Sequence, residues 1–116
     1  MILAVLDDLM FTSKIRTTAA QLGVDVTFAR SADTALAEMR KVPPSLVILD
    51  LNNPRTEPLT IVQSMKQDPA LASVPTVGYA SHVQTDVISA ARQAGVTDVL
   101  ARSAFTQHLA DILRQA

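Results

Sequence analysis

The sequence of 116 residues contains no cysteine, only 3% aromatic residues and three glycines. The absence of cysteine excludes disulfides, thiolate metal sites and cysteine nucleophiles, and it is consistent with a reducing compartment. With so few aromatics, the core must be built from aliphatic side chains, which are abundant because 48% of the residues are hydrophobic. The glycines are scattered at Gly23, Gly78 and Gly95. This spacing disfavours a glycine-rich loop for nucleotide binding.

An excess of charge of one sign is also lacking, because 10 basic residues stand against 11 acidic ones and the net charge is −1. Without a basic field or a basic amphipathic stretch, we expect no direct nucleic-acid partner and no membrane association. The apolar run at residues 2–6 has no basic lead and ends at two aspartates, so it predicts a strand and not a signal peptide. No apolar run approaches the length of a membrane span. We therefore expect a cytoplasmic protein.

Short apolar runs alternate with segments of helical periodicity along the whole chain. The expected strands are residues 2–6, 24–28, 46–49, 76–80 and 96–101, and the apolar stripes of the expected helices cover residues 11–22, 32–39, 59–65, 85–94 and 105–113. This alternation predicts an α/β fold, a doubly wound parallel sheet with helices on both faces. We expect the flavodoxin-like (βα)5 strand order 2-1-3-4-5, in which the less apolar second strand lies at an edge.

Acidic residues end two of the predicted strands. Asp7 and Asp8 follow the first strand, and Asp50 ends the third. In the order 2-1-3-4-5 these strands are neighbours, so we expect the three carboxylates to meet beyond their carboxyl ends. Like charges so close repel unless a proton or a cation intervenes, and oxygen ligands of this kind suit Mg²⁺. Taken singly, each aspartate is better explained as a cap or turn residue, whereas together they favour a site.

Asp50 is also positioned as a nucleophile, because a carboxylate can accept a phosphoryl group when a metal neutralises the incoming oxygens. The acidic ends of the first and third strands, with Pro54 four residues beyond Asp50, resemble the receiver domain of two-component response regulators. The resemblance covers essentially the whole chain. It implies an atypical, single-domain response-regulator receiver domain over residues 1–116.

The resemblance implies a role for each residue of the acidic site. Asp50 would be the phosphoacceptor for a histidine kinase or phosphotransfer protein, and Asp7, Asp8 and Asp50 would bind Mg²⁺ together with the main-chain carbonyl of Asn52. A downstream protein partner would read the face formed by the fourth helix, fifth strand and fifth helix, which is also a candidate surface for a homodimer. Such a protein would be a signalling module in a phosphorelay and not a conventional metabolic enzyme.

Three positions depart from the usual receiver pattern. Arg102 stands where receivers carry a lysine that contacts the phosphoryl group; it would grip phosphate, pair with Asp50 in competition with the metal, or be solvated. Ala80 stands where a threonine or serine hydroxyl is usual, so Ser81 is the candidate switch hydroxyl only if the strand ends earlier or bulges. Val99 replaces the usual aromatic residue of the fifth strand.

These departures leave two alternatives to a phosphorylated receiver. The first is a pseudo-receiver, an interaction module whose partner binding does not depend on phosphate. The second is a small aspartate-dependent phosphohydrolase on a related scaffold. Such enzymes usually need a second acid two residues after the nucleophile, where this chain has Asn52.

Overall fold

The sheet has the predicted strand order. The computed structural model describes residues 1–81 and 84–116, and within them five strands pair in parallel in the order β2-β1-β3-β4-β5. The strands are β1 (Ile2–Val5), β2 (Val26–Ala29), β3 (Leu46–Asp50), β4 (Thr76–Ala80) and β5 (Asp98–Ala101). The less apolar second strand lies at an edge, as expected. The flavodoxin-like fold class is therefore confirmed.

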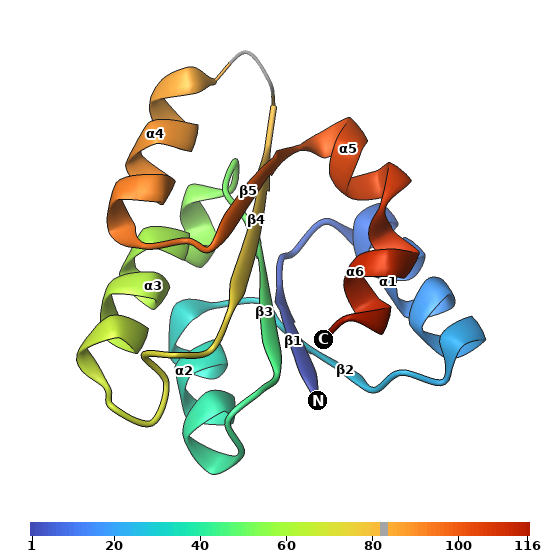
Figure 1. Cartoon of the computed structure of the whole chain (residues 1–116), viewed down its shortest axis with the longest axis horizontal. Coiled ribbons are helices and arrows are strands. Elements are labelled where there is room, and N and C mark those ends of the chain that lie inside the picture. The colour runs from blue at the N-terminus through green and yellow to red at the C-terminus, as the bar shows by residue number, and fades with distance from the viewer. Residues whose placement is uncertain (82–83) are drawn as a thin grey trace.

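Helices cover both faces of the sheet (Figure 1). The helices are α1 (Leu9–Leu22), α2 (Ala32–Lys41), the 3-10 turn η1 (Pro54–Thr56), α3 (Pro58–Gln67), α4 (Thr85–Ala94), α5 (Arg102–Gln107) and α6 (Leu109–Arg114). On one face α1 packs beside α6, with α5 next to it, and on the other face α3 lies between α2 and α4. This is the doubly wound arrangement that right-handed crossovers produce.

Local sequence signals set several of the helix ends. The Asp8 side chain caps α1, and Ser31 caps α2 by accepting the N–H of Thr34. Gly23 and Gly95 end α1 and α4 with φ angles of 68° and 107°, a left-handed conformation that favours glycine. The loops that follow β1, β3 and β5 lie at the same edge of the sheet because all of its strands run parallel.

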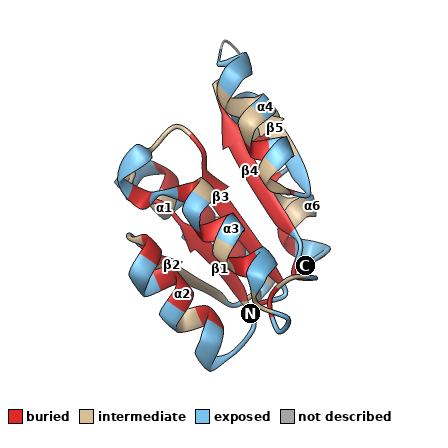
Figure 2. Cartoon of the chain, turned by 90° about the vertical axis from the view of Figure 1, so that its left-hand side faces the viewer, coloured by how far each residue is buried: buried red, intermediate tan, exposed pale blue. Residues whose placement is uncertain are grey.

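The core consists of two layers, one on each face of the sheet, and the inner strands β1, β3 and β4 between them are buried (Figure 2). The layer under α2, α3 and α4 is aliphatic, as the composition predicts. The layer under α1, α5 and α6 holds an aromatic cluster of Phe11, Tyr79 and Phe105, whose ring centroids lie 4.7 to 5.7 Å apart. Three of the four aromatic residues of the chain are thus gathered directly beneath the carboxyl edge of the sheet.

The end of the chain differs from the sequence prediction in one detail. The single last helix expected around residues 105–113 is two short helices, α5 and α6, which meet at His108. The hydrogen bonds continue across the junction, because the N–H of His108 donates to the carbonyl of Ala104 and the N–H of Ile112 donates to the carbonyl of His108. The apolar stripe therefore still faces the sheet.

Candidate functional site

The strands β1 and β3 bring the predicted acids to one edge of the sheet. Val5 pairs with Leu49 in the register of the two strands, so β1 and β3 end within one residue of each other. Asp7 and Asp8 follow β1, and Asp50 is the last residue of β3. The neighbouring strands required for an acidic site are therefore present.

Asp50 is a buried carboxylate, with only 7% of its surface exposed. One of its oxygens accepts the backbone N–H of Asn52 at 3.0 Å. Burial raises the pKa of Asp50 above its ordinary value, the Asn52 hydrogen bond and the charge of Arg102 oppose the rise, and the charges of Asp8 and Asp7 add to it. All three neighbouring charged groups are therefore close enough to Asp50 to act on it electrostatically.

Asp8 acts as a helix cap as well as a site residue. Its Oδ1 atom accepts the N–H groups of Met10 and Phe11 at 2.9 and 3.1 Å, and its Oδ2 atom accepts the Arg102 guanidinium at 2.9 Å. The hydrogen bond from Phe11 is the main cause that holds the pKa of Asp8 below its ordinary value. The interpretation of this aspartate as a cap is thus confirmed, and the cap faces the candidate site.

Arg102 is the first residue of α5 and pairs with Asp8. Its guanidinium carbon also lies 4.8 Å from the centroid of the Phe11 ring, so the cation is held between an acid and an aromatic face. About half of its side chain remains exposed. Arg102, which the resemblance matches to the usual lysine, is therefore oriented by Asp8, in a position from which its charge still reaches Asp50.

Two residues that the sequence analysis missed hold Asp7. The Arg55 guanidinium lies 3.2 Å from Asp7 Oδ2, and the Asn53 side-chain amide donates a hydrogen bond to Asp7 Oδ1. Both residues belong to the loop after β3, and Asn53 also caps the turn η1. A basic residue directly after Pro54, in the loop of an acidic strand end, is the sequence signal that could have identified Arg55.

The predicted switch hydroxyl lies outside the strand. β4 ends at the fully buried Ala80, and Ser81 follows it and lines a surface depression with Phe11 and Arg102. The N–H of Ser81 donates to the side-chain oxygen of Asn52 at 2.7 Å. Val99 packs with the aliphatic layer of the core. Ser81 thus contacts the loop of Asp50 through its backbone.

The donors at this edge suit Mg²⁺ chemically, because carboxylate and carbonyl oxygens are the hard ligands that this ion prefers. Within residues 1–81 and 84–116, however, no three acidic or histidine side chains form a group that could hold a metal ion. Both oxygens of Asp7 and both oxygens of Asp8 already have hydrogen-bond or ion-pair partners. A divalent cation at this edge would therefore compete with the guanidinium groups of Arg55 and Arg102 for these carboxylates.

A five-stranded doubly wound sheet with acids after β1 and β3 defines a receiver-type α/β domain. The sequence matches the family model of the response regulator receiver domain over residues 2–114. The chain belongs to this family, whose members are signalling modules of two-component systems. A search of curated proteins gave no significant match. In the described part of the chain, no helix combines the length and the apolar character needed to cross a bilayer.

Solved response regulators share the fold. The phosphorylated cyanobacterial phytochrome response regulator RcpA is 24% identical, with a TM-score of 0.81 over 98% of this chain and 88% of that one. The Mn²⁺-bound response regulator Rcp1 is also 24% identical, with a TM-score of 0.78 over 96% and 89% of the two chains. The chemotaxis protein CheY4 of Vibrio cholerae is 20% identical, with a TM-score of 0.84 over 98% and 95%.

Proposed function

We propose that Asp50 is the phosphoacceptor of a receiver domain formed by residues 1–116, and that a histidine kinase or a phosphotransfer protein supplies the phosphoryl group. One observation carries the proposal: the buried Asp50 carboxylate ends the central strand β3 at the edge where Asp7 and Asp8 follow the neighbouring strand β1 and where Arg102 pairs with Asp8. In the reaction, an Asp50 carboxylate oxygen forms a bond to phosphorus while the P–N bond of a phosphohistidine breaks. The departing imidazole nitrogen keeps the electron pair of that bond.

Magnesium is part of the proposal. When bound, the ion would neutralise phosphoryl oxygens, and Asp7, Asp8, Asp50 and the main-chain carbonyl of Asn52 would hold it. Arg102 would contact the phosphoryl group, because a guanidinium suits oxyanions and this one already lies beside Asp8. The neighbours RcpA, solved phosphorylated, and Rcp1, solved with Mn²⁺, support this assignment.

A small phosphodonor tests the proposal. The chain is incubated with acetyl phosphate and Mg²⁺, and intact-protein mass spectrometry follows the addition of one phosphoryl group. We expect addition to wild type, none to Asp50→Asn, and addition at the wild-type level to Asp25→Asn, whose exposed carboxylate lies at the opposite end of the sheet. An unmodified wild-type chain, or a modified Asp50→Asn chain, would refute the assignment of Asp50.

A second candidate function is the pseudo-receiver, an interaction module that does not depend on phosphate. The specific observation in its favour is that Arg55 and Arg102 pair with Asp7 and Asp8, so that two of the acids are partnered without a metal. The same phosphodonor experiment separates the two functions. A wild-type chain that takes up no phosphoryl group would support the pseudo-receiver, whereas phosphorylation that is lost in Asp50→Asn would count against it.

The phosphorylated domain would act by binding another protein. We propose that a downstream partner binds the face formed by α4, β5 and α5, and that the same face could join two copies of the chain. The proposed function requires no turnover of a small substrate and no direct nucleic-acid contact, and it places the protein in the cytoplasm, where we expect its kinase or phosphotransfer partner.

A further inference from the structure

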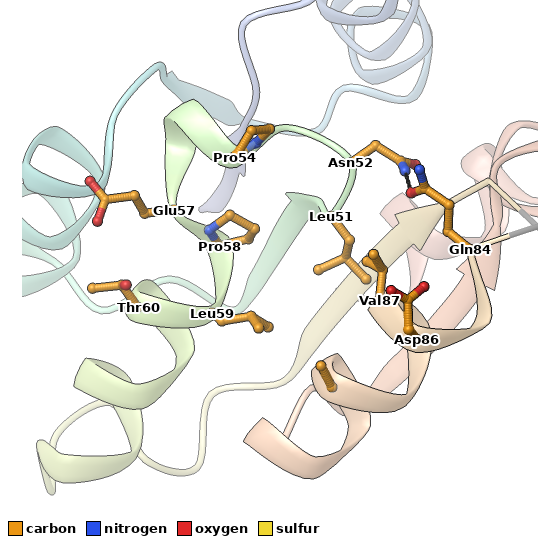
Figure 3. A pocket seen from close by; sticks show the side chains of 11 residues that line it. Leu51, Asn52, Pro54, Glu57, Pro58, Leu59, Thr60, Gln84, Asp86 and Val87 are labelled. Atoms are coloured by element: carbon orange, nitrogen blue, oxygen red, sulfur yellow. Dashed lines mark hydrogen bonds between the residues drawn. The ribbon is translucent and has the colours of Figure 1, made fainter.

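The side chain of Asn52 connects the loop that follows β3 to two residues near the start of α4, Ser81 and Gln84. Asn52 Oδ1 accepts the backbone N–H of Ser81 at 2.7 Å, and Asn52 Nδ2 donates to Oε1 of Gln84. Figure 3 shows the two side-chain amides facing each other, one from the loop after β3 and one from the residue before α4. Because a backbone N–H can only donate, the contact with Ser81 fixes which way the Asn52 amide points.

The same residue is also tied to the candidate phosphoacceptor. The backbone N–H of Asn52 donates to Asp50 Oδ1 at 3.0 Å, and the preceding N–H, that of Leu51, donates to the carbonyl of Tyr79 at 3.0 Å. Asn52 therefore contacts the Asp50 carboxylate through its backbone and the start of α4 through its side chain. No intervening residue is needed to connect the two.

β4 itself offers no side-chain link of this kind. Its last residue is Ala80, which is fully buried and has no hydroxyl. We infer that the Asn52 side chain is the positioning residue that passes the state of Asp50 to Ser81 and to the first turn of α4. The inference rests on the proposed function, because it assigns the relay of the same site.

The physical basis is a change of hydrogen-bond acceptor. When a phosphoryl group or its mimic is attached at the Asp50 carboxylate, the oxygen that accepts the Asn52 N–H changes its charge and position. Asn52 then moves, and the hydrogen bonds of its side-chain amide shift Ser81 and Gln84 in the same direction. Asn52 and Gln84 also line a groove of about 500 Å³ between α3 and α4, so their movement changes the shape of that groove.

Backbone amide NMR spectra recorded with Mg²⁺ and beryllium fluoride, a phosphoryl mimic, test the relay. In wild type we expect shifts at Asp50, at Ser81 and along α4. In Asn52→Ala, which keeps the backbone N–H and carbonyl of residue 52, we expect the Asp50 shift to persist while the shifts at Ser81 and α4 fall roughly twofold or more. A merely structural role of Asn52 would not separate these two responses.

Variants of Gln84 complete the experiment. Gln84→Ala removes only one of the two contacts and should give a smaller loss along α4, and adding it to Asn52→Ala should cause no further loss. Gln93→Ala removes an exposed amide from the same helix and should behave as wild type. If Asn52→Ala fails to fold, Gln84→Ala alone decides the test by its loss along α4.

Two outcomes overturn the inference in distinguishable ways. Shifts along α4 that Asn52→Ala and Gln84→Ala both retain at the wild-type level would refute the relay and leave the proposed function intact. A wild-type chain whose Asp50 amide does not respond to Mg²⁺ and beryllium fluoride would refute the proposed function, and the relay with it.

Discussion

Two of the three acids of this site form ion pairs with arginines. Arg55 and Arg102 lie against Asp7 and Asp8, so two guanidinium groups offset part of the charge that three carboxylates place at one edge of the sheet. Arg55 is 80% exposed, and exposed ion pairs contribute under about 1 kcal/mol. These contacts therefore reduce repulsion among the acids without making the site inaccessible to a competing cation.

We predict that Arg55→Gln strengthens Mg²⁺ binding. Removing the guanidinium frees Asp7 Oδ2, and the loss of an exposed ion pair limits the gain in affinity to about fivefold. An NMR titration of the Asp50 amide with Mg²⁺ measures the change. Arg40→Gln removes the same charge from the last turn of α2, where the side chain is exposed, and should leave the affinity unchanged. Equal affinities in Arg55→Gln and wild type would contradict the competition.

The hydroxyl of Tyr79 is buried without a hydrogen-bond partner among the residues that the structure describes. Burial, with a smaller contribution from the charge of Asp50, raises its pKa well above the ordinary value, so the phenol stays neutral. We predict that Tyr79→Phe raises the free energy of unfolding by about 1 kcal/mol, because it removes an unsatisfied polar atom and keeps the ring packing. Urea denaturation measures the change. A loss of stability would show that the hydroxyl has a partner in solution.

The strand β4 and the loop after β3 fit together at one close contact. Gly78 lies in the middle of β4, and a Cβ atom placed on it would come within 2.6 Å of Cδ1 and 2.9 Å of Cγ of Leu51. Leu51 directly precedes Asn52 and is itself buried. The missing side chain of Gly78 therefore lets the side chain of Leu51 pack directly against β4, next to the loop residue Asn52.

We predict that Gly78→Ala destabilises the fold by about 1–3 kcal/mol, because the added methyl group overpacks the contact with Leu51. Thermal or urea denaturation measures the loss. Leu51→Ala opens space at the same place, so the double variant should lose less stability than the sum of the two single losses. Strictly additive losses would mean that the two residues do not compete for that space.

Stability of the whole domain is linked to the ionisation of Asp50. Its pKa is raised in the folded chain, chiefly by burial, above the ordinary value of 3.8 for an aspartate carboxyl. Below that value the carboxyl is protonated in the folded and unfolded chain alike, so the burial of Asp50 does not lower the free energy of unfolding through a buried charge. As the pH rises through the folded pKa, the buried carboxylate must ionise, and the domain loses stability.

We predict that Asp50→Asn stabilises the domain at pH 7 by about 1 kcal/mol, because the amide can accept the same Asn52 N–H without a buried charge. The gain should disappear as the pH falls below the pKa of the unfolded carboxyl. Urea denaturation of both proteins across this pH range measures it. Asp25→Asn, at an exposed position, is the matched control and should show no such gain. A gain that persists unchanged in acid would refute the assigned cause.

The sequence alone determined the architecture and the place of the acids. Strand and helix periods, the caps at Asp8 and Ser31 and the glycine ends at Gly23 and Gly95 are local signals, because each depends on residues a few positions apart. From them followed the alternation of strands and helices, and with it the doubly wound class. The strand order of that class, together with the less apolar second strand, then gave the edge at which Asp7 and Asp50 lie.

Only the tertiary structure decided which partners these acids have. Arg102 and Asp8 are 94 residues apart in the chain, and Asn52 and Ser81 are 29 apart. Such contacts form where extended side chains from separate loops come together at the edge of the sheet. Neither the periodicity nor the spacing of residues in the sequence specifies these contacts. Sequence therefore located the acidic edge, whereas packing selected Arg55 and Arg102 as its counter-charges and Asn52 as its connection to α4.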